Sequence, residues 1–236
     1  MWFDEAVIYQ IYPLGLCGAP KENDGARTPR ILRLLDWVDH IKRLGADTVL
    51  LNPVFDSDRH GYDTRDYFTV DPRLGSDEDL AQVCRTFHQA GIRVMLDGVF
   101  NHTGYVSRYF NGDGFYPDVG ASQSWDSPYR PWFNFIQWPK KYESWWGIYS
   151  LPAVNEADPS YRDFIFAGEN SVVRRWLRAG ADGWRLDVAD ELPDDFVAGI
   201  HQAARAEKPD ALVIGEVWED GSTKVAYGVR RKHILG

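Results

Sequence analysis

Short apolar runs rich in β-branched residues alternate along this chain with longer stretches of helical spacing. The runs occupy residues 7–12, 47–51, 92–96, 183–188 and 211–216. This alternation is typical of βαβ units, in which parallel strands are joined by helices. It predicts an α/β fold with five parallel strands.

The helical stretches carry their own start and stop signals. Residues 30–44 place apolar side chains at helical spacing before Gly45, and a second helix is predicted between Ser76 and Gly91. Two further helices are predicted over residues 159–180, beginning at Pro159, and over residues 193–207.

The rhythm breaks over residues 103–158, which have no clear period and are rich in Gly, Pro, Ser and aromatic residues. A loop of this length inside a compact domain is usually functional or a small subdomain. Five of the chain's 10 tryptophans lie here, namely Trp125, Trp132, Trp138, Trp145 and Trp146. They predict either a small core under the loop or a surface for a ligand with flat apolar faces, such as a sugar ring.

The strand count leaves two architectures open. A closed (β/α)₈ barrel needs eight strands and typically about 250 residues. A chain of 236 residues with this insertion has no room for the last three units. An open doubly wound sheet can stop at five strands.

Charge and cysteine content limit the partners that we expect. The 26 Lys and Arg against 35 Asp and Glu give a net charge of −9, which argues against nucleic acid and anionic membranes. The amino-terminal stretch is acidic, unlike a signal peptide, and no apolar run approaches the roughly 18 residues of a spanning helix. Cys17 and Cys84 lack metal-binding spacing and favour a reducing compartment. We therefore expect a soluble, cytoplasmic protein.

Acidic residues fall at the ends of three consecutive predicted strands: Asp97, Asp187 and Glu216. In an α/β barrel the carboxyl ends of the strands meet at the rim where active sites are built. One such residue alone could simply cap the next helix, but three together indicate a site.

Arg185 lies two residues before Asp187, so both side chains point to the same face of a strand. We expect its charge to lower the pKa of Asp187, as a nucleophile requires, and the apolar neighbours of Glu216 to raise that pKa, which suits a general acid. Such a pair of carboxylates is typical of glycoside hydrolysis. A divalent-metal site of Asp97, Asp187, Glu216 and His102 is the competing interpretation, although a guanidinium would repel the ion.

Five segments resemble signatures of the α-amylase family (glycoside hydrolase family 13), in the order of that family. They are His-Gly-Tyr-Asp (60–63), Asp-Gly-Val-Phe-Asn-His (97–102), Leu-Pro-Ala-Val-Asn (151–155), Gly-Trp-Arg-Leu-Asp (183–187) and Gly-Glu-Val-Trp (215–218). The third resembles the group of neopullulanases, cyclomaltodextrinases and maltogenic amylases.

The resemblance implies a partial (β/α)₈ TIM barrel that contains about strands 1–5. Residues 1–102 and 159–236 would form this first part of the catalytic barrel. Residues 103–158 would be domain B, inserted after strand 3.

The resemblance also implies a role for each site residue. Asp187 would be the nucleophile that forms a covalent glycosyl intermediate, Glu216 the general acid/base, and Arg185 the residue that orients Asp187. Substrate would be bound by Tyr62, His102 and Trp218. Asp97 would be structural, bonding Arg185. Asn101 binds calcium in many members of the family, so calcium binding stays open here, but the chemistry requires no cofactor and no metal site is assigned.

The implied activity is hydrolysis of α-1,4 or α-1,6 bonds in malto-oligosaccharides, cyclodextrins or pullulan. Transglycosylation is an alternative within the same chemistry. Because no third carboxylate of the family's last signature follows Glu216, a non-catalytic fragment or one half of a split enzyme is another, and we expect the isolated chain to be inactive. Open edges at strands 1 and 5 would pair with the missing barrel half, on the same or a second chain, or with another copy.

Overall fold

Five parallel strands form the central sheet of the chain. The computed structural model describes residues 1–218, 220, 225–226 and 229–230. The strands are β1 (Ile8–Ile11), β2 (Thr48–Leu51), β5 (Arg93–Gly98), β8 (Gly183–Leu186) and β9 (Leu212–Gly215), in the order β1-β2-β5-β8-β9.

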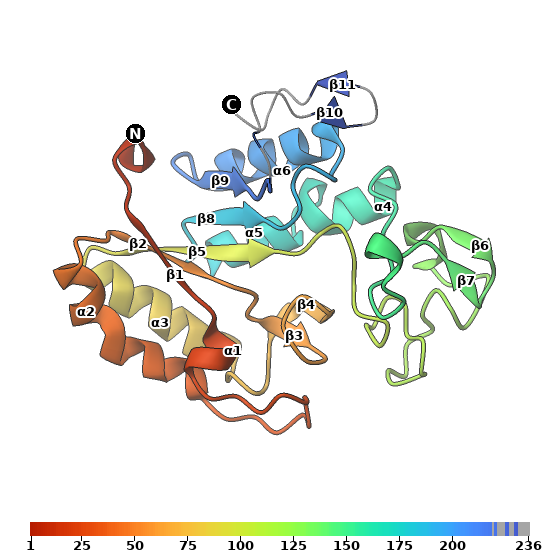
Figure 1. Cartoon of the computed structure of the whole chain (residues 1–236), viewed down its shortest axis with the longest axis horizontal. Coiled ribbons are helices and arrows are strands. Elements are labelled where there is room, and N and C mark those ends of the chain that lie inside the picture. The colour runs from red at the N-terminus through yellow and green to blue at the C-terminus, as the bar shows by residue number, and fades with distance from the viewer. Residues whose placement is uncertain (219, 221–224, 227–228, 231–236) are drawn as a thin grey trace.

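The order of the strands decides between the two predicted architectures. Each strand of the sheet lies beside the next one along the chain, as in a barrel, whereas a doubly wound sheet reverses its order part-way. The predicted partial (β/α)₈ barrel is confirmed (Figure 1).

Helices connect the strands, and α3 packs on β5 as α6 packs on β9 (Figure 1). The α-helices are α1 (Pro13–Leu16), α2 (Val38–Arg43), α3 (Asp77–Gln89), α4 (Pro159–Arg162), α5 (Val172–Arg178) and α6 (Asp194–Glu207). The Ser76 side chain caps α3 by accepting from the Asp79 backbone N–H, and the Asp79 side chain accepts from the Ser76 N–H in return.

Two helices predicted as continuous are divided. Over residues 30–44 a 3₁₀ helix (Arg30–Trp37) precedes α2. Over residues 159–180, α4 continues as a π-helical turn (Asp163–Ala167) that ends at Gly168, and α5 begins afresh at Val172. A Cβ at Gly168 would lie 2.7 Å from the Asp163 carbonyl oxygen, so the close approach that ends the turn needs glycine.

Several small elements were not predicted. An antiparallel hairpin, β3 (Phe55–Ser57) and β4 (Thr64–Val70), follows β2. Segment 103–158 contains β6 (Phe135–Gln137), β7 (Lys141–Tyr142) and two short 3₁₀ helices (Arg130–Trp132 and Trp145–Gly147). β10 (Val225–Ala226) pairs with β11 (Val229–Arg230).

The inserted segment lies on the side to which the arrows of β5, β8 and β9 point (Figure 1). Trp132 fixes it there: its buried ring packs on Tyr109 and Phe164 at 5.3 and 4.9 Å, and its indole N–H donates to the Ser160 hydroxyl at 2.7 Å. The core interpretation of the tryptophan cluster therefore holds for Trp132.

The first residues of the chain reach across the amino ends of later strands. Trp2 donates its indole N–H to the carbonyl of Asp210, which precedes β9, at 2.8 Å. The Arg93 guanidinium at the start of β5 lies 4.5 Å from the centre of the Trp2 ring. Among the residues described, no helix is long and apolar enough to cross a membrane.

Candidate active site

The strand ends bring the predicted charged residues together around one guanidinium. Arg185 donates from Nη1 to Asp97 Oδ1 at 2.7 Å and to Asp187 Oδ1 at 2.8 Å. Its Nη2 lies 2.8 Å from Glu216 Oε1. A cation held by three carboxylates occupies the place where a divalent metal would sit, so this geometry disfavours the metal interpretation.

The predicted pKa directions of the two carboxylates are wrong. Burial is the largest influence on Asp187 and, together with the negative charge of Asp97, raises its pKa to about 7 in spite of Arg185. Burial alone would raise the pKa of Glu216 as well, but the Val188 backbone N–H, the Trp218 side chain and the charge of Arg185 hold it below the usual value. One guanidinium shared by three carboxylates does not offset the desolvation of Asp187.

Val188 has a backbone conformation that no sequence pattern predicted. Its φ is +42°, which is rare for a β-branched residue, and its N–H donates to Glu216 Oε2 at 3.0 Å. The turn after Asp187 therefore fixes the carboxylate of Glu216. Strain of this kind is typical of functional sites.

Tyr62 and His102 are neighbours in the site, in contact through the Tyr62 backbone carbonyl. The Tyr62 hydroxyl donates to Asp97 Oδ2 at 3.3 Å and accepts from the Asn52 amide, a contact that sequence analysis missed. His102 Nε2 lies 3.1 Å from the Tyr62 carbonyl, and its Nδ1 lies 3.3 Å from the Asn101 amide nitrogen. Burial lowers the pKa of His102 to about 4, so the ring is neutral near pH 7.

The Asp63 side chain stabilises the loop that carries Tyr62 by hydrogen bonds to its backbone. This buried carboxylate accepts the backbone N–H groups of Arg59 at 3.0 Å and His60 at 3.2 Å. The loop is thereby fixed before any ligand binds.

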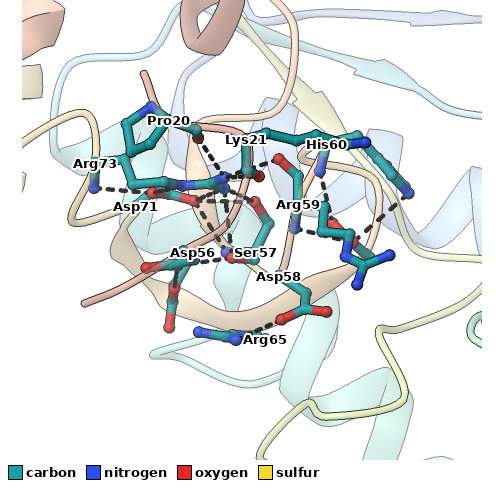
Figure 2. A network of polar contacts seen from close by, with 12 residues as sticks. Pro20, Lys21, Asp56, Ser57, Asp58, Arg59, His60, Arg65, Asp71 and Arg73 are labelled. Atoms are coloured by element: carbon teal, nitrogen blue, oxygen red, sulfur yellow. Dashed lines mark hydrogen bonds and ion pairs between the residues drawn. The ribbon is translucent and has the colours of Figure 1, made fainter. Parts of the chain in front are cut away.

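Arg73 binds the same loop through the backbone carbonyl of Arg59 (Figure 2). The side chains of Arg73 and Asp71 are fully buried and form a two-pronged pair, with contacts of 2.9 and 2.7 Å. Arg73 Nη1 also donates to the carbonyls of Pro20, Lys21 and Arg59 at 3.1, 2.9 and 2.8 Å. The network joins the loop after α1 to the loop between β3 and β4.

A cavity of about 370 Å³ opens over these groups. Six of the predicted site residues line it: Tyr62, His102, Arg185, Asp187, Glu216 and Trp218. Asp97 lies beneath it, fully buried against Arg185. The sequence does not distinguish among the clustered tryptophans, whereas the structure places Trp145 in the cavity wall, with its ring stacked on that of His102 at a centroid distance of 5.3 Å.

Asn101 is the residue for which the family resemblance leaves calcium binding open. Its amide faces His102, and in the described part of the chain no three His, Cys, Asp or Glu side chains are placed to hold a metal ion. Calcium binding stays a prediction.

Comparison with known proteins identifies the family. Residues 32–233 match the family described as alpha amylase, catalytic domain. The chain belongs to the α-amylase family. Its geometry at the carboxyl ends of β5, β8 and β9 can therefore be compared with that of other α-amylase-family barrels.

Two curated relatives illustrate the similarity. The chain is 40% identical over 206 residues to an amylopullulanase of Thermoanaerobacterium saccharolyticum, covering 79% of this chain and 16% of the relative. It is 30% identical over 244 residues to a cyclomaltodextrinase of Thermoanaerobacter pseudethanolicus, covering 94% of this chain and 41% of the relative. The chain thus spans less than half the length of these α-amylase-family relatives.

A solved structure has the same fold. The cyclic α-maltosyl-(1→6)-maltose hydrolase of Arthrobacter globiformis, in complex with cyclic α-maltosyl-(1→6)-maltose, superposes with a TM-score of 0.76 at 30% identity. The match covers 92% of this chain and 52% of that one.

Proposed function

We propose that this chain carries the nucleophile and the general acid/base of a retaining α-glucan hydrolase. The observation that supports the proposal is the contact of one guanidinium, Arg185, with Asp97, Asp187 and Glu216 at the rim of a cavity. The substrates would be α-1,4- or α-1,6-linked malto-oligosaccharides, cyclodextrins or pullulan. Location in the cytoplasm stays a prediction from the sequence.

In the proposed reaction an Asp187 carboxylate oxygen attacks the anomeric carbon while the bond to the leaving oxygen breaks. Glu216 gives its proton to that oxygen. A water molecule then gives a proton to Glu216 and attacks the same carbon, which releases Asp187 and retains the configuration. Arg185 would orient Asp187, and Tyr62 would support the sugar ring.

Binding of the sugar would favour protonation of Glu216, which must act as the acid. In the free site Asp187 has the higher pKa, whereas acid catalysis needs the proton on Glu216. The Glu216 side chain is 28% exposed, so a sugar that covers it would remove water from the carboxylate and raise its pKa. The proton can then pass from the Asp187 side to Glu216 as substrate binds.

The test is kinetic and uses the protein that contains this chain. Asp187→Asn should abolish release of reducing sugar from maltotriose and cyclodextrin, while Asp126→Asn, at an exposed position of the inserted segment, should not. Glu216→Gln should slow cleavage of maltotriose by about 10²–10⁴-fold. It should slow a nitrophenyl glucoside much less, because that leaving group needs no proton. Unchanged turnover in Asp187→Asn would refute the assignment.

The two alternatives from the sequence have their own readouts. Longer products at high oligosaccharide concentration would favour transglycosylation, in which a sugar hydroxyl replaces water. Clear hydrolysis by the isolated 236-residue chain would refute the interpretation as a non-catalytic fragment. Co-purification of a second chain that contributes the remaining strands would support a split enzyme.

A further inference from the structure

Trp146 adopts a backbone conformation that bulky residues rarely have. Its φ and ψ are +50° and +27°, in the left-handed region. Such strain persists only where the surrounding contacts determine it, and it is common where binding needs a preset geometry.

Those contacts form a row of rings that leads out of the catalytic cavity. Trp145 stacks on His102, and Trp146 stacks on Trp145 with centroids 5.5 Å apart. Trp146 in turn meets Trp218 edge-on at 5.2 Å, and its indole N–H donates to Glu191 at 2.8 Å. The row joins the inserted segment to the loops that follow β8 and β9.

Beside the catalytic cavity lies a larger groove of about 830 Å³. Trp145, Val188 and Trp218 line both, so the two spaces adjoin along that edge. Trp146 lines only the groove, and it is 67% exposed there although one side of its ring stacks on Trp145. Glu143 and Glu191 also line the groove.

These surfaces match the chemistry of a sugar chain. A pyranose ring has apolar faces that pack on indole rings and hydroxyl edges that donate to carboxylates. An indole that is already held by two neighbouring rings and a hydrogen bond loses little freedom when a sugar packs on it. Trp146 and Trp218 together present such a fixed aromatic corner next to the reacting groups.

We propose that Trp146 is a specificity-determining residue that binds sugar units beyond the catalytic cavity, on the Trp218 side of the cleaved bond. The inference rests on the proposed function and adds a preference for longer α-glucan chains. A short glucan that fills only the catalytic cavity does not reach Trp146.

The test compares a short with a long glucan by calorimetry, in the Asp187→Asn background so that neither is cleaved. Trp146→Gly removes the ring and relieves the left-handed strain, which offsets part of the lost ring contacts, so the variant should fold and unfold within a few degrees of its parent. Its affinity for maltohexaose should fall about tenfold, and its affinity for maltose should stay unchanged. Trp146→Phe should retain part of the maltohexaose affinity.

Trp125→Ala is the matched control. Trp125 belongs to the same segment and is 60% exposed, but it packs on Arg130 and Trp138 and lines neither the cavity nor the groove. Its removal should change neither affinity. Equal losses for both glucans in Trp146→Gly, or no loss for either, would overturn the role of Trp146. Absence of any glucan binding by the parent would instead overturn the proposed function, and this inference with it.

Discussion

Replacing Asp187 by Asn should make the folded protein more stable at neutral pH. Burial raises the pKa of Asp187 from 3.8 to about 7, so between these values the folded state binds a proton that the unfolded state has lost. Stability therefore falls as pH rises through this window. The asparagine amide keeps an oxygen that accepts from Arg185 but has no charge to desolvate. The stability of the variant therefore does not fall as pH rises through this window.

The size of the effect follows from the same numbers. A pKa difference from 3.8 to about 7 corresponds to at most about 4 kcal/mol. Asp97, whose pKa burial raises to about 6, takes up protons over part of the same range, so we expect a gain of about 2–4 kcal/mol at pH 8. At pH 4 the aspartate is neutral in the folded state, and the two proteins should differ little.

Urea unfolding at pH 4, 6 and 8, followed by tryptophan fluorescence, measures the difference. The free energy of unfolding of Asp187→Asn should exceed that of the parent by an amount that grows with pH and levels off above about pH 7. Asp126→Asn, at an exposed position, should show no such trend. A difference that is the same at pH 4 and pH 8, or a variant that is less stable at pH 8, would contradict the reasoning.

Three further substitutions test how much packing, a buried ion pair and a helix cap around the site contribute to stability. Gly215→Ala would place a Cβ 2.6 Å from the Cβ of Ala189, so the free energy of unfolding should fall by about 1–3 kcal/mol in thermal unfolding. An unchanged melting temperature would mean that β9 shifts to accommodate the methyl group. Arg73→Met leaves the buried Asp71 charge without its counter-ion, so the free energy of unfolding in urea should fall by about 3–5 kcal/mol. Adding Asp71→Asn to the same chain should restore part of that stability. Ser76→Ala removes the α3 cap and should cost about 1 kcal/mol in the same assay, and a loss of several kcal/mol would assign Ser76 a larger role.

The strands were predictable because their signal is local. Each parallel strand is built around a short, mostly apolar run, and the order of the runs along the chain is also their order in the sheet. The interruption of helix 159–180 was not predictable, because it depends on the close approach of Gly168 to Asp163. The hairpin β3–β4 was missed because β3 has only three residues and because β4, although seven residues long, mixes polar and apolar residues without clear alternation.

In the site, the sequence predicted which residues meet but not their electrostatics. Strand ends and spacing placed Arg185, Asp187 and Glu216 together. The pKa directions failed because they depend on how deeply each group is buried and on how many carboxylates share one guanidinium. The positions of Trp145 and Trp146 depend on the irregular path of the inserted segment, which has no periodic signal.

The contact between Trp2 and Asp210 sets a minimum time for folding during synthesis. The two residues are 208 positions apart, and ribosomes add about 5–20 residues per second, so Trp2 waits about 10–40 s for its partner. The amino-terminal segment is therefore among the last parts of the described fold to dock, and an indole at residue 2 would report by its fluorescence when β9 has joined the sheet.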